Sequence, residues 1–173
     1  MSFKRQQIVS EIPRLRRFAR ALAGDVVLAD DLVQDCLERA LSRQQQWQVG
    51  SNMRAWLFTI LRNLYINQLR QNKRRGPELP YDETLDFAGS SAPNQEQNLA
   101  LRDLKLALAR LPNEQREVLL LVGLEGMSYK ETSEILAIPV GTVMSRLSRG
   151  RESLRQSMET GETAIPPRLR RVK

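Results

Sequence analysis

The sequence predicts an all-α protein made of two small helical domains joined by a flexible linker. Aromatic residues are only 5% of the 173 residues, and leucine, alanine and arginine are abundant, which favours helices over strands. Apolar residues recur at helical spacing in several separate stretches. Charge also divides the chain, because residues 1–75 carry 14 basic and 6 acidic side chains whereas residues 76–100 carry 5 acidic and no basic ones. Glycine, proline and serine gather in residues 76–94, so we expect the linker there.

The first 75 residues are expected to form three helices. The first ends at Gly24, the second begins near Ala29, and the third runs from about Asn52 to Lys73, after a glutamine-rich loop around Trp47. Cys36 is expected to be a small buried residue of the second helix. The expected apolar faces are Ile8, Ile12, Leu15, Ala19 and Leu22; Leu32, Val33, Cys36, Leu37, Ala40 and Leu41; and Trp56, Leu57, Ile60, Leu61, Leu64 and Leu69.

Residues 95–158 are expected to form the second helical domain. Its first helix is indicated by Leu101, Leu104, Leu108 and Leu111, after which Pro112 ends it. Three more helices are expected: one capped by Asn113, one that begins with a capping box of Ser128 and Glu131, and one from Val143 to about Met158. Residues 159–173 contain two consecutive prolines and four basic side chains, which predicts a flexible basic tail.

Composition excludes several function classes. Histidine is absent and Cys36 is the only cysteine, so we expect no metal, no disulfide, no cofactor and no histidine base. No phosphate loop or hydrolase motif occurs, and an enzyme is not expected. The net charge of +7 indicates attraction to nucleic acid. No apolar run approaches the ~20 residues of a membrane span, and no signal peptide opens the chain, so a soluble cytoplasmic protein is expected.

Residues 128–151 give the strongest functional pattern. A capped helix with Ile135 and Leu136 inward is followed by a tight connection and a helix with Val143 and Leu147 inward. This is typical of a helix-turn-helix, whose second helix lies in the major groove of DNA. Thr142 and the free amides at the start of that helix are suited to phosphate. The alternative is an ordinary helix pair with a solvated basic face.

Two stretches of the sequence resemble one known family. Residues 111–119 with 128–151 resemble region 4 of bacterial RNA polymerase sigma factors, and residues 29–35 with 54–63 resemble region 2, most closely in the extracytoplasmic-function (ECF) class of the sigma-70 family. The resemblance implies that residues 1–75 are region 2 and residues 95–158 are region 4. It further implies a factor that binds core RNA polymerase, directs promoter-specific initiation in a stress or environmental response, and is held by an anti-sigma factor.

The resemblance also assigns roles to individual residues. Region 2 docks on polymerase through an acidic helix face, which maps onto Asp31, Gln34, Asp35 and Glu38. Spacing alone favours a plain solvated face at these positions, and the resemblance reverses that interpretation. Reading and melting of the minus-10 element maps onto Gln48, Ser51, Asn52, Arg62, Asn63, Asn67 and Arg70. Reading of the minus-35 element maps onto Thr142, Met144, Ser145, Arg146, Ser148, Arg149 and Arg151.

Some alternatives stay open at the level of sequence. Trp56 could stack on a base, although its place beside the apolar set favours the core, and residues 73–75 could contact phosphate or form a solvated helix end. A stand-alone helix-turn-helix regulator would leave the first domain unexplained. A sigma-like interaction protein that titrates an anti-sigma factor would not need the arginines of the recognition helix.

Overall fold

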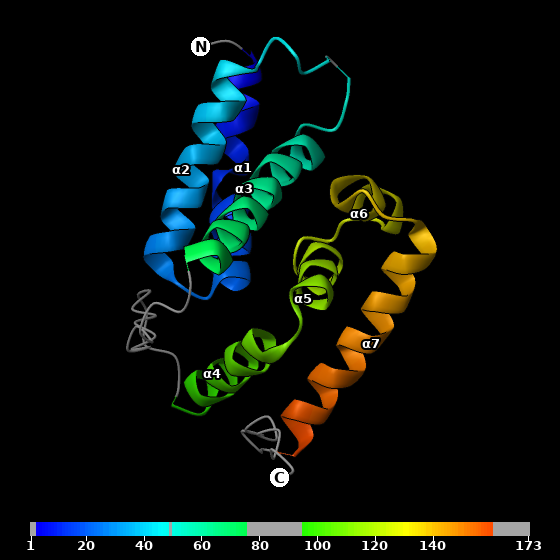
Figure 1. The fold of residues 1–173 in the computed structure, drawn as a ribbon. Coiled ribbons are helices and arrows are strands. Elements are labelled where there is room, and N and C mark those ends of the chain that lie inside the picture. The colour runs from blue at the N-terminus through cyan, green and yellow to red at the C-terminus, as the bar shows by residue number, and fades with distance from the viewer. Residues whose placement is uncertain (1–2, 49, 76–94, 161–173) are drawn as a thin grey trace.

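The computed structural model describes residues 3–48, 50–75 and 95–160. These residues form seven α-helices and one π-helical segment without any strand, which confirms the all-α prediction (Figure 1). The predicted linker, residues 76–94, lies outside the described residues, as do residues 161–173 of the predicted tail. No helix within the described ranges is long and apolar enough to cross a membrane.

The first domain consists of α1 (Phe3–Ala23), α2 (Val26–Ser42) and α3 (Met53–Arg75), which pack against one another (Figure 1). Gly24 ends α1 in the left-handed conformation, at φ +71°, which glycine adopts without steric cost. Asp25 caps α2 by accepting a 2.7 Å hydrogen bond from the Leu28 amide. Because of this cap, α2 begins three residues before the predicted start at Ala29.

The core of the first domain lies between these three helices. Phe18 and Phe58 meet edge to face with ring centroids 5.0 Å apart. Cys36 is buried, as predicted, and burial raises the pKa of its thiol to about 12. The prediction that Leu41 is buried is wrong, because this residue is 40% exposed. It follows the buried Ala40 by one position in the last turn of α2, which turns its side chain away from the core.

The second domain consists of α4 (Gln95–Arg110), α5 (Asn113–Leu119), the π-helical segment η1 (Leu120–Leu124), α6 (Tyr129–Leu136) and α7 (Val140–Glu159). Two predicted helix starts are wrong. The residue before α5 is Pro112 rather than Asn113, and α7 begins at Val140 rather than Val143, since Pro139 precedes it in an extended conformation. Leu101, one of the leucines that indicated this first helix, is 48% exposed, whereas Ala107 of α4 is buried.

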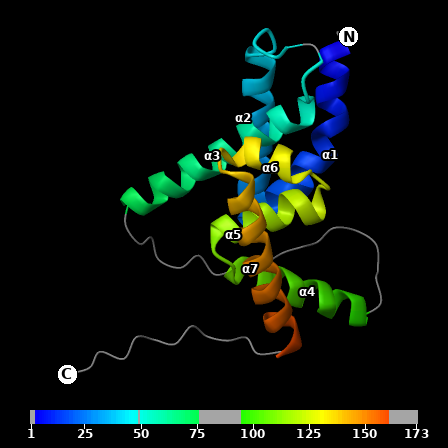
Figure 2. The same ribbon diagram turned by 90° about the vertical axis from the view of Figure 1, so that its right-hand side faces the viewer.

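The two domains pack directly against each other. Helix α3 contacts α6, and α1 contacts η1 and α4, so that buried residues of both domains join in a single apolar cluster. Figure 2 shows α5 and α6 beside the helices of the first domain. This packing brings the predicted helix-turn-helix next to the helix that was assigned to minus-10 DNA.

Candidate nucleic-acid interface

The helix-turn-helix is held by local hydrogen bonds. Ser128 and Glu131 form the predicted capping box, in which the Glu131 amide donates to Ser128 Oγ at 3.1 Å and the Ser128 amide donates to Glu131 Oε2 at 2.8 Å. The turn passes through Ala137 at φ 53°, a left-handed position that costs an alanine about 1–2 kcal/mol. The Ser133 hydroxyl donates to the Ile138 carbonyl at 2.6 Å across this turn. These bonds set the direction in which α7 leaves α6.

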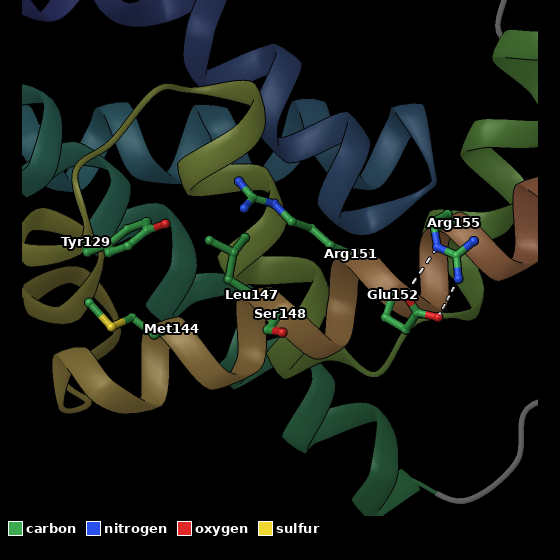
Figure 3. Close-up of a pocket in the computed structure, with 7 residues that line it drawn as sticks. All are labelled: Tyr129, Met144, Leu147, Ser148, Arg151, Glu152 and Arg155. Carbon is green, nitrogen blue, oxygen red and sulfur yellow. Dashed lines mark hydrogen bonds and ion pairs between the residues drawn. The ribbon is translucent and has the colours of Figure 1, made fainter.

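The outer face of α7 carries most of the residues assigned to minus-35 DNA. Met144, Ser148, Arg149 and Arg151 are exposed, and Met144 is 49% so. Figure 3 shows a shallow pocket on this face, to which Tyr129 of α6 also contributes. An exposed helix face that combines an apolar side chain, a hydroxyl and arginines can contact thymine methyls, base edges and phosphates.

The remaining three residues of this set are less accessible. The Arg146 side chain is 23% exposed and lies 3.5 Å from Glu114 of α5. The Ser145 hydroxyl donates to the Thr142 carbonyl at 3.1 Å, and the Thr142 amide donates to the Pro139 carbonyl at 3.0 Å. The free amides at the start of α7 are therefore those of residues before Thr142.

The acidic face assigned to polymerase lies on α2. Asp31, Gln34, Asp35 and Glu38 are all exposed, and Gln34 donates to Glu38 Oε1 at 3.2 Å. The other face of the helix holds the buried Leu32, Val33 and Cys36. The four residues thus form a continuous polar surface on an otherwise basic domain, which suits a basic protein partner.

The loop assigned to the minus-10 element is fixed at its ends. Trp47 is buried, and Lys4 lies 5.4 Å from its ring centroid while donating to the Gln44 carbonyl at 3.2 Å and to the Trp47 carbonyl at 3.5 Å. Gln48, Ser51 and Asn52 are exposed; residue 49 lies outside the described residues. Asn52 caps α3, since its Oδ1 accepts from the Ala55 amide at 3.1 Å.

Helix α3 presents a polar surface, but one of its arginines is already paired. Asn63, Asn67 and Arg70 are exposed. Arg62 instead donates to both carboxylate oxygens of Glu117 on α5, at 3.1 and 3.4 Å. Trp56 is half-buried and packs against the apolar cluster, as the core interpretation predicted.

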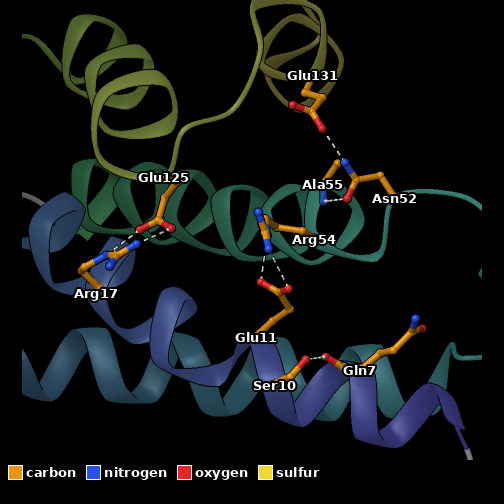
Figure 4. Close-up of polar contacts among 9 residues, drawn as sticks. All are labelled: Gln7, Ser10, Glu11, Arg17, Asn52, Arg54, Ala55, Glu125 and Glu131. Carbon is orange, nitrogen blue, oxygen red and sulfur yellow. Dashed lines mark hydrogen bonds and ion pairs between the residues drawn. The ribbon is translucent and has the colours of Figure 1, made fainter.

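Sequence reasoning did not identify the acidic residues of the second domain that meet the first. Glu117 and Glu125 have side chains only 1% and 0% exposed, and Arg17 of α1 donates to both oxygens of Glu125 at 3.0 and 2.9 Å (Figure 4). Burial raises the pKa of Glu117, although the Arg62 guanidinium partly opposes the shift. The Glu125 carboxylate raises the pKa of Arg17. The sequence feature that could have identified Glu117 and Glu125 is their position, one at each edge of the apolar run of residues 118–124.

Known proteins match the chain in both domains. The Sigma2 domain of PhyR matches residues 8–62, and Sigma-70 region 4 matches residues 101–154. The ECF RNA polymerase sigma factor EcfG of Rhodopseudomonas palustris is 43% identical over 152 residues, which are 87% of this chain and 82% of that protein. SigE of Mycolicibacterium smegmatis, another ECF sigma factor, is 36% identical over 87% of this chain and 62% of its own length.

Solved structures share the fold. The sigma factor RpoE of Bartonella quintana, in complex with the anti-sigma factor NepR, superposes with a TM-score of 0.77 and 36% identity, over 91% of this chain and 98% of that one. CnrH, in complex with the cytosolic domain of CnrY, superposes with a TM-score of 0.67 over 92% of this chain and 89% of that one. At 24% identity, the latter shows the likeness of fold alone.

Proposed function

The chain belongs to the ECF class of the sigma-70 family of RNA polymerase sigma factors, and from this premise we propose which of its surfaces bind core polymerase and which bind each promoter element. Members of this family direct transcription initiation and are not themselves catalysts. The acidic face of α2 docks on core polymerase, the 48–52 loop with α3 reads and holds the minus-10 element, and α7 reads the minus-35 element.

One observation carries this proposal: the exposed outer face of α7 lies on a capped helix-turn-helix inside the stretch that matches Sigma-70 region 4. The N-terminal end of such a recognition helix enters the major groove. Arg149 and Arg151 are exposed, and neither makes an ion pair among the described residues. Both arginines are therefore available to phosphates or to guanine.

We infer that an anti-sigma factor controls the protein. Support comes from RpoE, which is 36% identical and is bound by the anti-sigma factor NepR. A sigma factor that is held by an inhibitor acts only on release, which suits a response to stress or environmental change. We place the protein in the cytoplasm, where core polymerase and promoter DNA are found.

The sigma-like titrating protein remains the second candidate because the Sigma2 domain of PhyR matches residues 8–62. A solved PhyR, named an anti-anti-sigma factor, is however only 20% identical to this chain, against 36% for the sigma factor RpoE. A titrating protein would bind the inhibitor without supporting initiation, so transcription separates the two candidates.

The test is reconstitution with core RNA polymerase, using co-elution and transcription of genomic fragments as readouts. We expect the wild type to co-elute and to initiate at a defined subset of promoters. Asp35→Arg should abolish co-elution because it places a positive charge at the centre of the acidic face. Asp103→Arg makes the same charge change on the exposed surface of α4 and serves as the control. Unchanged co-elution of Asp35→Arg would refute the docking surface, and binding without any initiation would favour the titrating protein.

A further inference from the structure

The loop that joins α2 to α3 is shaped by its own hydrogen bonds. The Gln46 amide donates to the Arg43 carbonyl at 2.8 Å in a first turn. In a second turn, the amide and the hydroxyl of Ser51 both donate to the Gln48 carbonyl, at 3.1 and 2.8 Å. These bonds join residues three positions apart, so they fix the shape of each turn but not the place of the loop on the domain.

Helix α1 contacts both ends of this loop from one of its faces. At the entry, the Lys4 ammonium donates to the Gln44 and Trp47 carbonyls. At the exit, Arg54 in the first turn of α3 donates to both oxygens of Glu11, from Nε at 2.9 Å and from Nη2 at 3.2 Å (Figure 4). Lys4 and Glu11 are seven residues apart, which is about two helical turns, so both side chains project from the same face of α1.

The contact at the exit is stronger than an ordinary surface ion pair. The Glu11 side chain is 14% exposed and that of Arg54 is 34% exposed, so solvent screens this pair less than two fully exposed charges. Paired bonds between a guanidinium and a carboxylate also fix their relative direction. The hydrogen bond from Glu11 raises the pKa of Arg54, which keeps the guanidinium charged. The pair therefore fixes the position of the first turn of α3 relative to α1.

At the entry, Lys4 acts on the backbone rather than on a carboxylate. Its ammonium lies 5.4 Å from the Trp47 ring centroid, and the Trp47 side chain is buried. A cation that bonds two carbonyls and also lies over an aromatic ring gains from both kinds of contact. Gln48, which follows directly, is exposed. The chain is therefore fixed to α1 up to the residue at which the exposed part of the loop begins.

We propose that α1 positions the 48–52 loop for the minus-10 element, with Lys4 and Glu11 as positioning residues at its two ends. This inference rests on the proposed function for what the loop binds. Neither side chain has to touch DNA, because each acts through the end of the loop that it contacts. Both contacts are made within the first domain, so they do not depend on the second.

One set of variants tests whether Glu11 and Arg54 act as a unit. Glu11→Gln keeps the size of the side chain and removes its charge, and Arg54→Lys keeps the charge and removes the fork of donors. If the pair positions the loop, the double variant should lose little more than either single variant. Asp30→Asn is the matched control, since it also removes one negative charge and one ion pair of α1, with Arg20 near the other end of that helix.

Hydrogen–deuterium exchange on the chain alone measures the anchoring. Glu11→Gln and Lys4→Ala should each speed exchange of the amides of residues 44–53 by about five-fold. Peptides from the middle of α2 and α3 should be unchanged, and Asp30→Asn should leave the loop as it is in the wild type. Circular dichroism checks that helix content is retained in every variant.

Holoenzyme on a promoter fragment measures the consequence for DNA. The fragment is one at which the wild type initiates; a gel shift at low temperature reports the closed complex, and permanganate reactivity of unpaired thymines reports the open complex. Glu11→Gln and Lys4→Ala should each lower the open fraction by about five-fold and leave the closed complex unchanged. One substitution removes a negative charge and the other a positive charge, so attraction to DNA does not explain a loss in both.

Each outcome bears on the proposal. Unchanged exchange of the loop in both variants would overturn it, as would faster exchange without loss of open complexes. Additive losses in the double variant of Glu11 and Arg54 would mean that Arg54 acts on DNA independently, which also overturns the role of Glu11. If the wild-type holoenzyme initiates at no fragment, the proposed function fails, and exchange alone then decides whether α1 anchors the loop.

Discussion

Gly150 lies where α7 crosses α5, and replacing it by alanine tests how closely the recognition helix is seated. Glycine inside a helix is normally unfavourable, so Gly→Ala at such a place usually stabilises a protein by about 1 kcal/mol. Here a Cβ on residue 150 would lie 2.9 Å from Leu119 Cδ1, 3.2 Å from Leu119 Cγ and 3.4 Å from Gln115 Cβ. Ordinary contacts between carbons are about 3.5–4.0 Å.

The two effects have opposite signs, and the structure decides between them. Leu119 is itself 9% exposed, and both Cδ1 and Cγ are too close, so rotation of one methyl group does not clear the space. Overpacking of this kind costs about 1–3 kcal/mol. With about 2 kcal/mol lost and about 1 kcal/mol gained, we expect Gly150→Ala to lower the free energy of unfolding by about 1 kcal/mol. For a domain of 60–100 residues, this lowers the melting temperature by about 4–8 °C.

Urea unfolding followed by far-UV circular dichroism measures the change. Gly141→Ala is the matched control, because Gly141 is also in α7 and a Cβ there would meet nothing within 4 Å. We expect Gly141→Ala to be neutral or stabilising. If Gly150→Ala stabilises the protein as much as Gly141→Ala does, the close approach of α5 and α7 is refuted.

Three further predictions concern single side chains. Arg149→Ala should cost about 1–3 kcal/mol of affinity for a promoter fragment in a gel-shift assay, whereas Arg155→Ala, whose arginine is neutralised by two glutamates, should cost less. Ser128→Ala removes the α6 cap and should lower the free energy of unfolding by about 1 kcal/mol, and Ser128→Asp should restore most of it. The Cys36 thiol should react with a disulfide reagent only in denaturant, since burial raises its pKa to about 12. Equal thiol reactivity with and without denaturant would contradict the burial. The raised pKa also means that the folded chain favours the neutral thiol, so the contribution of Cys36 to the free energy of unfolding should fall as pH rises from 9.0 to about 12.

Local signals were sufficient to predict most of the elements. The capping box of Ser128 and Glu131 and the inward pair Val143 and Leu147 predicted the helix-turn-helix because the two members of each pair lie within one helical turn of each other. Starts of α2 and α7 were placed three residues late, since apolar spacing does not reveal the turn that precedes the first buried side chain. A cap at Asp25 and a proline at residue 139 decide those boundaries.

The packing between the domains could not be predicted in this way. Glu117 and Glu125 look like ordinary surface acids in the sequence, but they are buried where the domains meet, and Arg62 and Arg17, 55 and 108 residues away in sequence, donate to them. Arg62 was assigned to minus-10 DNA through the resemblance to region 2 of sigma factors. That assignment stays a prediction, and the structure adds that the same face also binds another part of the chain.

In the 48–52 loop, the residues that anchor the loop to the core are different from the residues that face solvent. Trp47 and Met53 are buried on either side of the loop, and Lys4 donates hydrogen bonds to the carbonyls of Gln44 and Trp47 just before it. Gln48 and Ser51, by contrast, are exposed to solvent. Substitutions at the exposed positions therefore leave the core intact, while substitutions at the anchors disturb it. If the loop reads the minus-10 element as proposed, single substitutions at Gln48 and Ser51 can alter promoter preference with little loss of folding stability.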